Sequence, residues 1–541
     1  MNGFVPDPIK QKRFTFVEAA TIIGLALVPL FMSFPYRVNI FLSWEGAYRI
    51  SQGQVPYRDF GMPLGYMYWA LPALFFKIFG PQLITLVKAQ VVINIASGFA
   101  FRSILRSVGL QPGIRLLSVI LYCISFSFFN FWPWYNHTVI VYEMIGLAFL
   151  TNYLFSENKK WWKLTASAFF IFCSFFTKQD GGGLALVLAL ALLAHVCFYE
   201  KKWKPFLIFG ASFFAVALVL IGPLLQYRFG YWFNHGQPPH TARVSMFDIL
   251  DEFLYNSQWI KFYIFIILLL VIASYRSWKN FIEDKKGSFF LLLTLGILAE
   301  AAILQVTSYT PPDNNIFFHS FAFAFILSYL ARFLNLDFFR SKTLLVGAFG
   351  LFLWWSSVFW KYLQRIAQRA MPAAEVQVEG GENIVNRKTY QYHMGPKEIP
   401  MSEWRFSNLK SFKKVYMPGA TVDGIERLMN THLAGLEKPK VLNMSELTPL
   451  AAEVPYEYET GPDIPLWHHL GVGMFNSQAA AYEQKIATKQ YDVVLFEYIP
   501  SLNNFFPFRV RDSLKKHYQM IDSFPAPRRG ETQGLIEVYK K

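Results

Sequence analysis

QLITLVKAQVVINIASGFAFRSILRSVGLQPGIRLLSVILYCISFSFFNFW, residues 82–132, contains two apolar runs separated by a basic gap. Each run is about long enough to cross a hydrocarbon core of ~30 Å as a helix. The gap contributes the basic residues Arg102, Arg106 and Arg115. Because Lys and Arg gather in the cytoplasmic loops of membrane proteins, the gap is expected to face the cytoplasm. The stretch therefore predicts a pair of membrane-spanning helices and their orientation.

The same alternation of apolar runs and basic gaps continues over the first two-thirds of the chain. The apolar runs lie near 15–34, 82–101, 116–132, 138–155, 164–176, 183–199, 205–227, 258–275, 288–306, 315–332 and 343–360. We expect a polytopic α-helical membrane protein with about eleven transmembrane helices. Its N-terminus would be cytoplasmic, and the first span would be a retained signal anchor because no small-residue cleavage site follows it.

The apolar stretch Leu64–Gly80 is treated separately from these spans. Counting it as a span would place the next basic gap outside and break the alternation downstream. Its central Pro72, its aromatic residues and Lys77 instead favour a helix that lies in the membrane interface.

The totals exclude several other classes of protein. The chain carries a net charge of +15, but the charge is spread over short loops between apolar runs, which argues against a nucleic-acid binder. The three cysteines (Cys123, Cys173 and Cys197) all fall inside predicted spans. The sequence therefore predicts neither a disulfide framework nor a thiolate metal site.

Composition changes near Lys361, and no later apolar run reaches spanning length. We expect a transmembrane domain over 1–362 and a small α/β domain of about 150 ordered residues within 363–541. An odd number of spans would place this second domain outside the cytoplasm. The predicted strands are Lys414–Met417, Val441–Met444, Tyr491–Tyr498 and Leu535–Tyr539, and the predicted helices are Val422–Leu433, Met444–Ala452 (N-capped by Ser445) and Ser477–Lys489.

The first outward loop, FLSWEGAYRISQGQVPYRDFGMPLGYMYW (41–69), concentrates charged residues beside the membrane. An acid such as Glu45 or Asp59, facing a site walled by apolar side chains, can have a raised pKa and serve as a general base. The alternative is structural, with Glu45 and Asp59 pairing with Arg49 and Arg58 to hold the loop. Composition alone leaves both interpretations open.

An acid after the first span is followed by G-x-x-P-Y-R-D-F (Gly53 to Phe60), an aromatic helix ending in Phe79-Gly80, and a second span. This order resembles the GT-C glycosyltransferases, which include protein O-mannosyltransferases and lipid A aminoarabinose transferases. The resemblance is clearest over 15–185. Where that family has an acidic pair Asp-Glu, this chain has Trp44-Glu45, so Glu45 would act alone or with Asp59.

The resemblance implies a sugar donor carried on a polyprenyl phosphate and transfer on the extracytoplasmic side of the membrane. The acceptor, a glycan, a lipid or a protein, stays open, as does the inverting or retaining outcome. A bacterial inner membrane suits this compact chain, with the C-terminal domain in the periplasm and membrane lipids as its surroundings.

Glycosyl transfer from a lipid phosphate needs a base for the acceptor hydroxyl and positive charge for the departing phosphate. Lys77 and Lys88 could supply that charge, since a lysine inside a span is costly unless it is paired or functional. In the short loop Thr177–Gly183, Lys178, Gln179 and Asp180 precede glycines that allow a ligand to approach the backbone. Lys178 would lie near the phosphate, and Asp180, like Asp59, would support Glu45 as the base. A tight turn with a snorkelling lysine is the structural alternative, and the Gly-Lys-Ser/Thr order of a P-loop is absent.

Four further candidate residues lie in the other outward loops. His137 could bind a divalent ion together with Glu45 or Asp180, but no His-x-x-x-His pattern or acidic cluster supports a metal, so no cofactor is certain and a divalent ion stays open. Arg243 lies in a loop long enough to cover a lipid-linked substrate. Tyr309 and Asp313 could bind sugar hydroxyls, although a proline-stiffened connector explains them equally well.

Two alternative functions share these features. A transporter or flippase of lipid-linked glycans also has many spans and charges within the membrane, but the sequence shows no inverted repeat and no pair of broken spans in matching halves. A polysaccharide polymerase or ligase uses the same lipid-linked substrates. The discriminating question is whether Glu45, Lys88 and Lys178 meet in one outer cavity or line a path across the bilayer.

Overall fold

The structure is a computed structural model. It describes residues 8–36, 40–129, 131–233, 245–308, 316–356, 359–360, 363–364, 367, 399, 403–454, 456–466, 468–469, 475–503, 506–528 and 533–541. The chain forms two compact units. The first comprises Met1–Met32, Ile40–Leu353 and Glu459–Gln478, and the second comprises Ser33–Asn39, Trp354–Tyr458 and Ala479–Lys541. All candidate site residues that the structure describes belong to the first unit. The predicted division at 362/363 remains a prediction.

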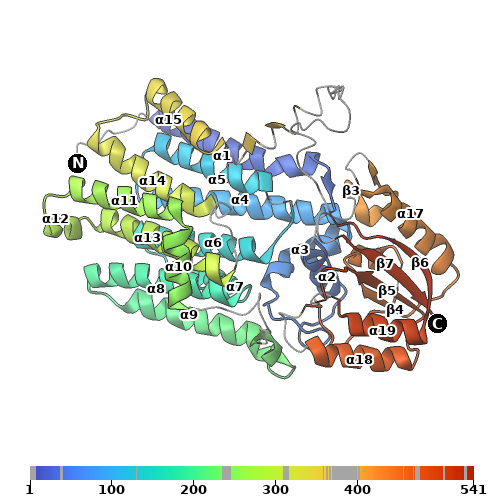
Figure 1. Ribbon diagram of the computed structural model, residues 1–541. Helices are drawn as coiled ribbons and strands as arrows, with labels where there is room; N and C mark the ends of the chain where they lie inside the picture. The colour runs from blue at the N-terminus through green and yellow to red at the C-terminus, as the bar shows by residue number, and fades with distance from the viewer. Residues whose placement is uncertain are drawn as a thin grey trace. The chain divides into compact units, whose positions relative to one another are not determined.

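The first unit is a bundle of apolar helices (Figure 1). A helix lies at each predicted span: α1 (Pro8–Phe31), α4 (Leu83–Ser107), α5 (Pro112–Phe129), α6 (Tyr135–Phe155), α7 (Trp162–Phe175), α8 (Gln179–Glu200), α9 (Lys204–Ile221), α11 (Gln258–Ser274), α13 (Lys285–Thr307), α14 (Ile316–Phe333) and α15 (Ser341–Trp354). The short α12 (Trp278–Glu283) connects α11 with α13. The chain is thus an integral, multi-pass membrane protein.

The number of spans is smaller when length and apolarity are applied strictly. Among the described residues, six helices (α1, α4, α6, α8, α9 and α13) are long and apolar enough to cross a membrane by themselves. The count rises to seven if α10 (Met246–Tyr255) and α11, bent by 84°, are one broken span. The remaining apolar helices of the bundle are shorter, so the predicted total of about eleven remains a prediction.

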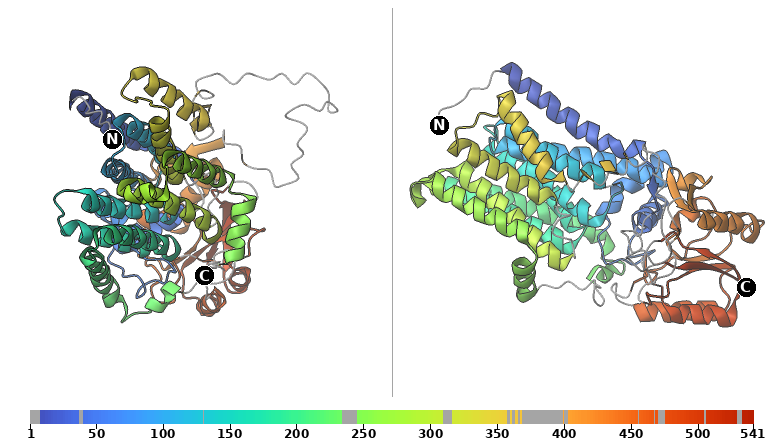
Figure 2. Two further views of the ribbon diagram at one scale, coloured as in Figure 1. Left: turned by 90° about the vertical axis from the view of Figure 1, so that its left-hand side faces the viewer. Right: turned by 45° about the horizontal axis from the view of Figure 1, so that its top comes forward.

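The helices run alongside one another in both views of the bundle (Figures 1 and 2). Helix α1 packs on α4 and α5, α6 packs on α4, α7 and α8, and α14 packs on α5, α11 and α13. Several polar side chains inside the bundle pair with one another, which lowers the cost of placing them in the low dielectric of a membrane interior. The side-chain amide of Gln90 donates to Asn94 Oδ1 at 2.8 Å, and Tyr263 hydrogen-bonds His319 at 2.7 Å.

Two short helices, two 3₁₀ turns and their connecting loops build one end of the bundle. They are α2 (Ile40–Ser51), α3 (Met67–Phe79), η1 (Gly222–Leu224) and η2 (Phe229–Phe233). Helix α3 lies within the predicted interfacial stretch Leu64–Gly80 and has 13 residues, too few to span a bilayer. It ends at Gly80, whose φ of 83° favours glycine. Its placement in the membrane interface remains a prediction.

The second unit contains two small sheets. A three-stranded sheet has the order β1-β3-β2, with β1 (Phe34–Pro35), β2 (Trp404–Phe406) and β3 (Val415–Pro418). A four-stranded sheet has the order β4-β5-β7-β6, with β4 (Val441–Met444), β5 (Val493–Tyr498), β6 (Gln519–Pro525) and β7 (Leu535–Lys540). β4 and β5 are parallel, and the other pairs in this sheet are antiparallel. The helices and turns are η5 (Lys410–Phe412), α17 (Gly419–Arg427), η6 (Leu428–His432), η7 (Thr448–Ala452), α18 (Phe475–Ala487) and α19 (Phe508–His517).

The four predicted strands coincide with β3, β4, β5 and β7 within two residues at each end. The predicted helix Met444–Ala452 is wrong, because β4 ends at Met444 and only the 3₁₀ turn η7 follows. The side chain of Asn443 accepts hydrogen bonds from the backbone N–H and the hydroxyl of Ser445. This local Asx turn uses Ser445 as a donor, so Ser445 is not the predicted helix cap.

Candidate functional site

Helix α2 carries Glu45, the leading candidate base. The sequence analysis treated 41–69 as a loop, but Ile40–Ser51 is helical. The helix places Glu45 and Arg49 one turn apart on the same face, and Arg49 Nε donates to Glu45 Oε1 at 2.9 Å. Both residues are buried, at 8% and 5% exposure. The pairing that was the structural alternative is therefore present.

The surroundings of Glu45 shift the pKa of its carboxyl group. Burial raises the pKa of Glu45 above its ordinary value of 4.5, and the charge and hydrogen bond of Arg49 only partly offset that effect. Arg49 also donates to Gln54 Oε1 at 3.2 Å and to the backbone oxygen of Glu459 at 3.1 Å. The guanidinium is therefore held in place independently of Glu45. A carboxylate with a raised pKa can take a proton from a bound hydroxyl.

Asp59 holds a turn in the loop after α2. Its carboxylate accepts the backbone N–H of Val55 at 2.7 Å and the guanidinium of Arg58 at 2.7 Å. The hydrogen bond from Arg58 is the main cause that keeps the pKa of Asp59 below its ordinary value. The backbone oxygen of Asp59 accepts the N–H of Gly461 at 2.9 Å. These contacts occupy Asp59 in the loop structure.

A segment distant in sequence fixes the same loop. Gly61 exchanges backbone hydrogen bonds with Ile464 (2.7 Å) and Leu466 (3.0 Å).

Burial and the nearby charge of Arg49 lower the pKa of His468 to about 4, so this imidazole is neutral at pH 7. The sequence predicts that 363–541, including His468, belongs to the second domain, and no local pattern indicates that 459–478 belongs with the helical unit.

The loop also contains backbone strain at Tyr57. This fully buried tyrosine has a φ of 67°, a conformation that costs energy for a bulky residue. Its hydroxyl donates to the backbone oxygen of Leu64 at 2.7 Å, and its N–H donates to that of Phe60 at 2.7 Å. Eight residues further, a Cβ on Gly65 would overlap the backbone oxygen of Phe176. The loop is thus held tightly against the end of α7.

A second polar cluster forms where α8 begins and α13 ends. Lys178 Nζ lies 3.1 Å from Asp180 Oδ2 and donates to Ser308 Oγ, whose hydroxyl donates to Asp180 Oδ2 at 2.7 Å. Asp180 Oδ1 accepts the backbone N–H of Gly181 at 2.8 Å, at the positive end of the α8 dipole. The sequence analysis predicted Lys178 and Asp180 together but missed Ser308, which precedes the loop considered there.

Gln179 joins this cluster to the loop after α2. Its side-chain amide donates to the backbone oxygens of Trp232 at 2.7 Å and Pro63 at 3.4 Å. The clusters around Glu45 and Asp180 thus belong to the same end of the bundle. Within the part of the chain that the structure describes, no hydrogen bond or ion pair joins them directly.

The remaining lysine candidates lie near the turn between α3 and α4. Lys88 Nζ sits 4.5 Å from the ring centroid of Phe79, a cation–π contact that draws it toward the end of α3. Lys77 is exposed, two residues before Phe79. Over the ranges described, neither lysine has an acidic partner, whereas Arg49, Arg58 and Lys178 each have one.

His137 lies in the first turn of α6 and is part-buried. No group of three or more His, Cys, Asp or Glu side chains suited to a metal ion occurs among the described residues. The predicted contributions of Arg243, Tyr309 and Asp313 lie outside the described residues.

The sequence and the fold were compared with those of known proteins. Neither a protein-family model nor a curated protein matches the sequence. Among solved structures, that of ArnT from Cupriavidus metallidurans in the apo state is similar, with a TM-score of 0.51 and 10% identity, over 97% of this chain and 98% of that chain. The fold is GT-C-like. The same ArnT bound to undecaprenyl phosphate matches with a TM-score of 0.48 and 8% identity, over 97% of each chain.

The GT-C-like fold confirms the resemblance found around Glu45 and Phe79-Gly80. It extends that resemblance from 15–185 to nearly the whole chain.

Proposed function

We propose that this chain is a membrane glycosyltransferase that moves a sugar from a polyprenyl-phosphate donor to an acceptor on the extracytoplasmic face. The observation that carries the proposal is the GT-C-like fold, shared with ArnT over almost the full length of both chains. The acceptor would be a glycan, a lipid or a protein. The proposed setting is a bacterial inner membrane, with the N-terminus in the cytoplasm and residues 363–541 forming a periplasmic α/β domain.

Glu45 is the proposed general base. It is a buried carboxylate with a raised pKa, and Arg49 orients it through an ion pair that the helix spacing of α2 enforces. Asp59 supports the loop rather than the reaction, since its oxygens are engaged by Val55 and Arg58. Asp180 would orient substrate groups through its hydrogen-bonded cluster with Lys178 and Ser308.

Lys77 and Lys88 are the proposed source of charge for the departing phosphate. A phosphate needs net positive charge nearby, and a basic residue already neutralised by an acid provides little of it. Lys178 pairs with Asp180, and Arg58 pairs with Asp59. The two lysines at the α3–α4 turn carry charge without an acidic partner in the described structure, so they are better placed electrostatically to bind the donor.

The donor is tested by native mass spectrometry of the full-length protein in mild detergent, with added undecaprenyl phosphate as probe. We expect the wild-type protein to retain the lipid and the Lys88→Ala variant to lose most of it. Lys279→Ala, at an exposed position on α12, is the matched control and should retain the lipid fully. If the wild-type protein retains undecaprenyl phosphate no better than it retains a zwitterionic phospholipid, the polyprenyl-phosphate donor is excluded from the proposal.

The base is tested separately with Glu45→Gln. This variant keeps the size of the side chain and can still accept the hydrogen bond of Arg49, so the protein should fold and bind lipid as the wild type does. Transfer of sugar from a lipid-linked donor extract should fall by roughly 10²–10⁴-fold, the usual contribution of a general base. Transfer retained within twofold would exclude Glu45 as the base while leaving the donor result intact.

A further inference from the structure

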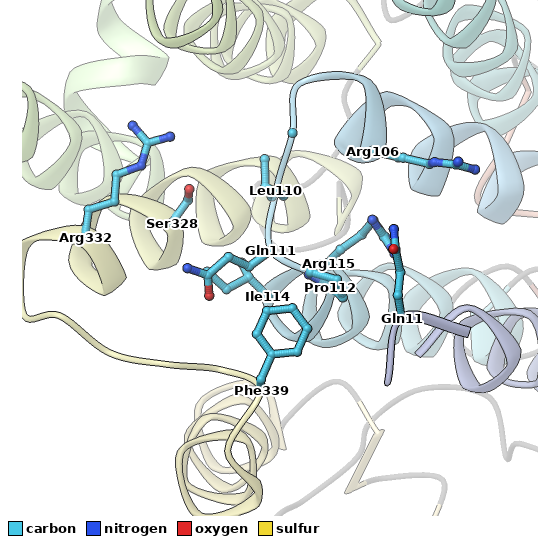
Figure 3. A pocket seen from close by; sticks show the side chains of 11 residues that line it. Gln11, Arg106, Leu110, Gln111, Pro112, Ile114, Arg115, Ser328, Arg332 and Phe339 are labelled. Carbon is cyan, nitrogen blue, oxygen red and sulfur yellow. The ribbon is translucent and has the colours of Figure 1, made fainter. Parts of the chain in front are cut away.

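A cavity of about 470 Å³ opens where α1, α4, α5 and α14 come together (Figure 3). It lies at the C-terminal end of α4, whereas Lys88 and the candidate site are at the N-terminal end of that helix. At 1.5 Å per residue, Lys88 and Arg106 are separated by roughly 27 Å along the helix axis. The cavity is therefore a separate feature from the proposed transferase site.

The polar lining of the cavity is basic. Arg106 comes from α4, Arg115 from α5 and Arg332 from α14, and none of the described residues that line the cavity is acidic. Arg115 is 4% exposed and uses its Nε to bind Glu18 at 2.8 Å. Arg106 and Arg332 are exposed and have no acidic partner in the ranges that the structure describes. The cavity thus carries excess positive charge.

The acid bound to Arg115 does not cancel this charge. Glu18 is fully buried on α1, and its two oxygens are bound by Arg102 at 2.6 Å and by Arg115 at 2.8 Å. One carboxylate shared by two guanidinium groups leaves a net charge of about +1 at this pair of helices. Arg106 and Arg332 add to it. The first turn of α5, which includes Pro112, Ile114 and Arg115, also lines the cavity and places the positive end of the helix dipole there.

The remaining lining suits a ligand that is charged at one end and apolar at the other. Gln111 and Ser328 provide hydrogen-bonding groups, and Leu110, Ile114 and Phe339 provide apolar walls. Figure 3 shows the Gln111 side chain directed toward the side of the cavity where Ser328 and Arg332 lie. The volume lies in the range of about 300–1,000 Å³ that is usual for small-molecule sites.

We propose that this cavity binds the phosphodiester headgroup of an anionic membrane phospholipid. The cavity is located where the apolar helices end, which is the level of lipid headgroups. Directly after Arg332, Phe333 and Leu334 are 59% and 54% exposed. They offer an apolar surface against which acyl chains can lie, a feature that a soluble phosphate would not use. Basic pockets between transmembrane helices are a known means of binding such headgroups.

The test is a titration of the full-length protein in detergent with phosphatidylglycerol, followed by native mass spectrometry, with phosphatidylcholine as the reference lipid. We expect phosphatidylglycerol to bind at least about tenfold more tightly. The double variant Arg106→Gln/Arg332→Gln should weaken its binding by about thirty-fold, the effect of two basic residues near an anionic headgroup. Arg106→Lys/Arg332→Lys keeps both charges and should recover most of the affinity.

The matched control is Lys160→Gln/Lys202→Gln, which removes two exposed lysines elsewhere on the bundle. This control should bind phosphatidylglycerol with an affinity within twofold of that of the wild-type protein. An equal loss in both double variants would show a general charge effect and overturn the proposal, as would no preference for phosphatidylglycerol in the wild-type protein. Complete displacement of phosphatidylglycerol by millimolar inorganic phosphate would assign the cavity to a soluble anion instead. A thermal melt of each variant confirms that it is folded before its binding is compared.

Discussion

Replacing Glu18 by glutamine should destabilise the protein far more than replacing an exposed glutamate. Glu18 is fully buried on α1 and bridges Arg102 on α4 and Arg115 on α5. Removing one partner of a buried ion pair typically costs about 3–5 kcal/mol, because the other charge is left uncompensated. Here two guanidinium groups lose their shared carboxylate, and both side chains are at most 12% exposed. Glutamine preserves the size, so the loss is electrostatic.

Thermal unfolding of purified protein in detergent measures the effect. At about 2 °C per kcal/mol for a large domain, the Glu18→Gln variant should melt roughly 6–10 °C below the wild type. Glu283→Gln is the control, because Glu283 is 63% exposed and its pair with Lys279 spans 3.9 Å, so its midpoint should shift by less than about 1 °C. Adding Arg102→Gln to Glu18→Gln should restore part of the loss. Equal shifts for the Glu18 and Glu283 variants would refute the reasoning.

Three other outcomes are expected. Gly65→Ala should destabilise the protein by more than about 1 kcal/mol, because its Cβ would overlap the backbone of Phe176. Gly183→Ala, which has open space around its Cβ, should instead stabilise α8 by up to about 1 kcal/mol. Thermal melts of the two variants, run in parallel, compare these effects. The rate of sugar transfer should fall as pH drops through the raised pKa of Glu45, above 4.5, because only the deprotonated carboxylate accepts a proton, and a rate that stays constant as the pH is lowered to 4.5 would contradict this. His468 has a pKa of about 4, below its unfolded value, so the free energy of unfolding should fall by up to about 3 kcal/mol as pH falls from 6.5 to 4, and His468→Gln should flatten that part of the stability profile.

The positions of the apolar helices could be predicted from the sequence because each depends on a local property. A long run of apolar residues forms a helix within a membrane, so a helix lies at each predicted run, as α4 does at 82–101. The same holds for β4, β5 and β7, whose side-chain pattern is local. The error at Met444–Ala452 arose because Asn443 binds Ser445 and diverts the backbone into a turn.

The contacts that define the candidate site could not be predicted in this way. Arg49 binds the backbone of Glu459, 410 residues away, and Ser308 joins Lys178 and Asp180 from the end of another helix. The sequence indicated that the charged residues after the first span were unusual, but it did not indicate which of them pair. Periodicity predicts the faces of elements, whereas these partners depend on the packing of several helices.

The ratio of basic side chains to carboxylates differs between the two ends of α4. Neutralising Glu18 tests the consequence of this difference for stability and for lipid binding. Around the candidate site, Arg49 and Lys178 each face one carboxylate, whereas beside the cavity the single carboxylate of Glu18 is shared by Arg102 and Arg115. Neutralising Glu18 should therefore lower stability and, at the same time, free Arg115 and strengthen binding of phosphatidylglycerol by about fivefold, the effect of one charge near the headgroup. The opposite signs separate the two causes, because general damage to the fold lowers both quantities. Binding must be measured well below the melting midpoint of the variant, and weaker binding there would contradict the electrostatic account of the cavity.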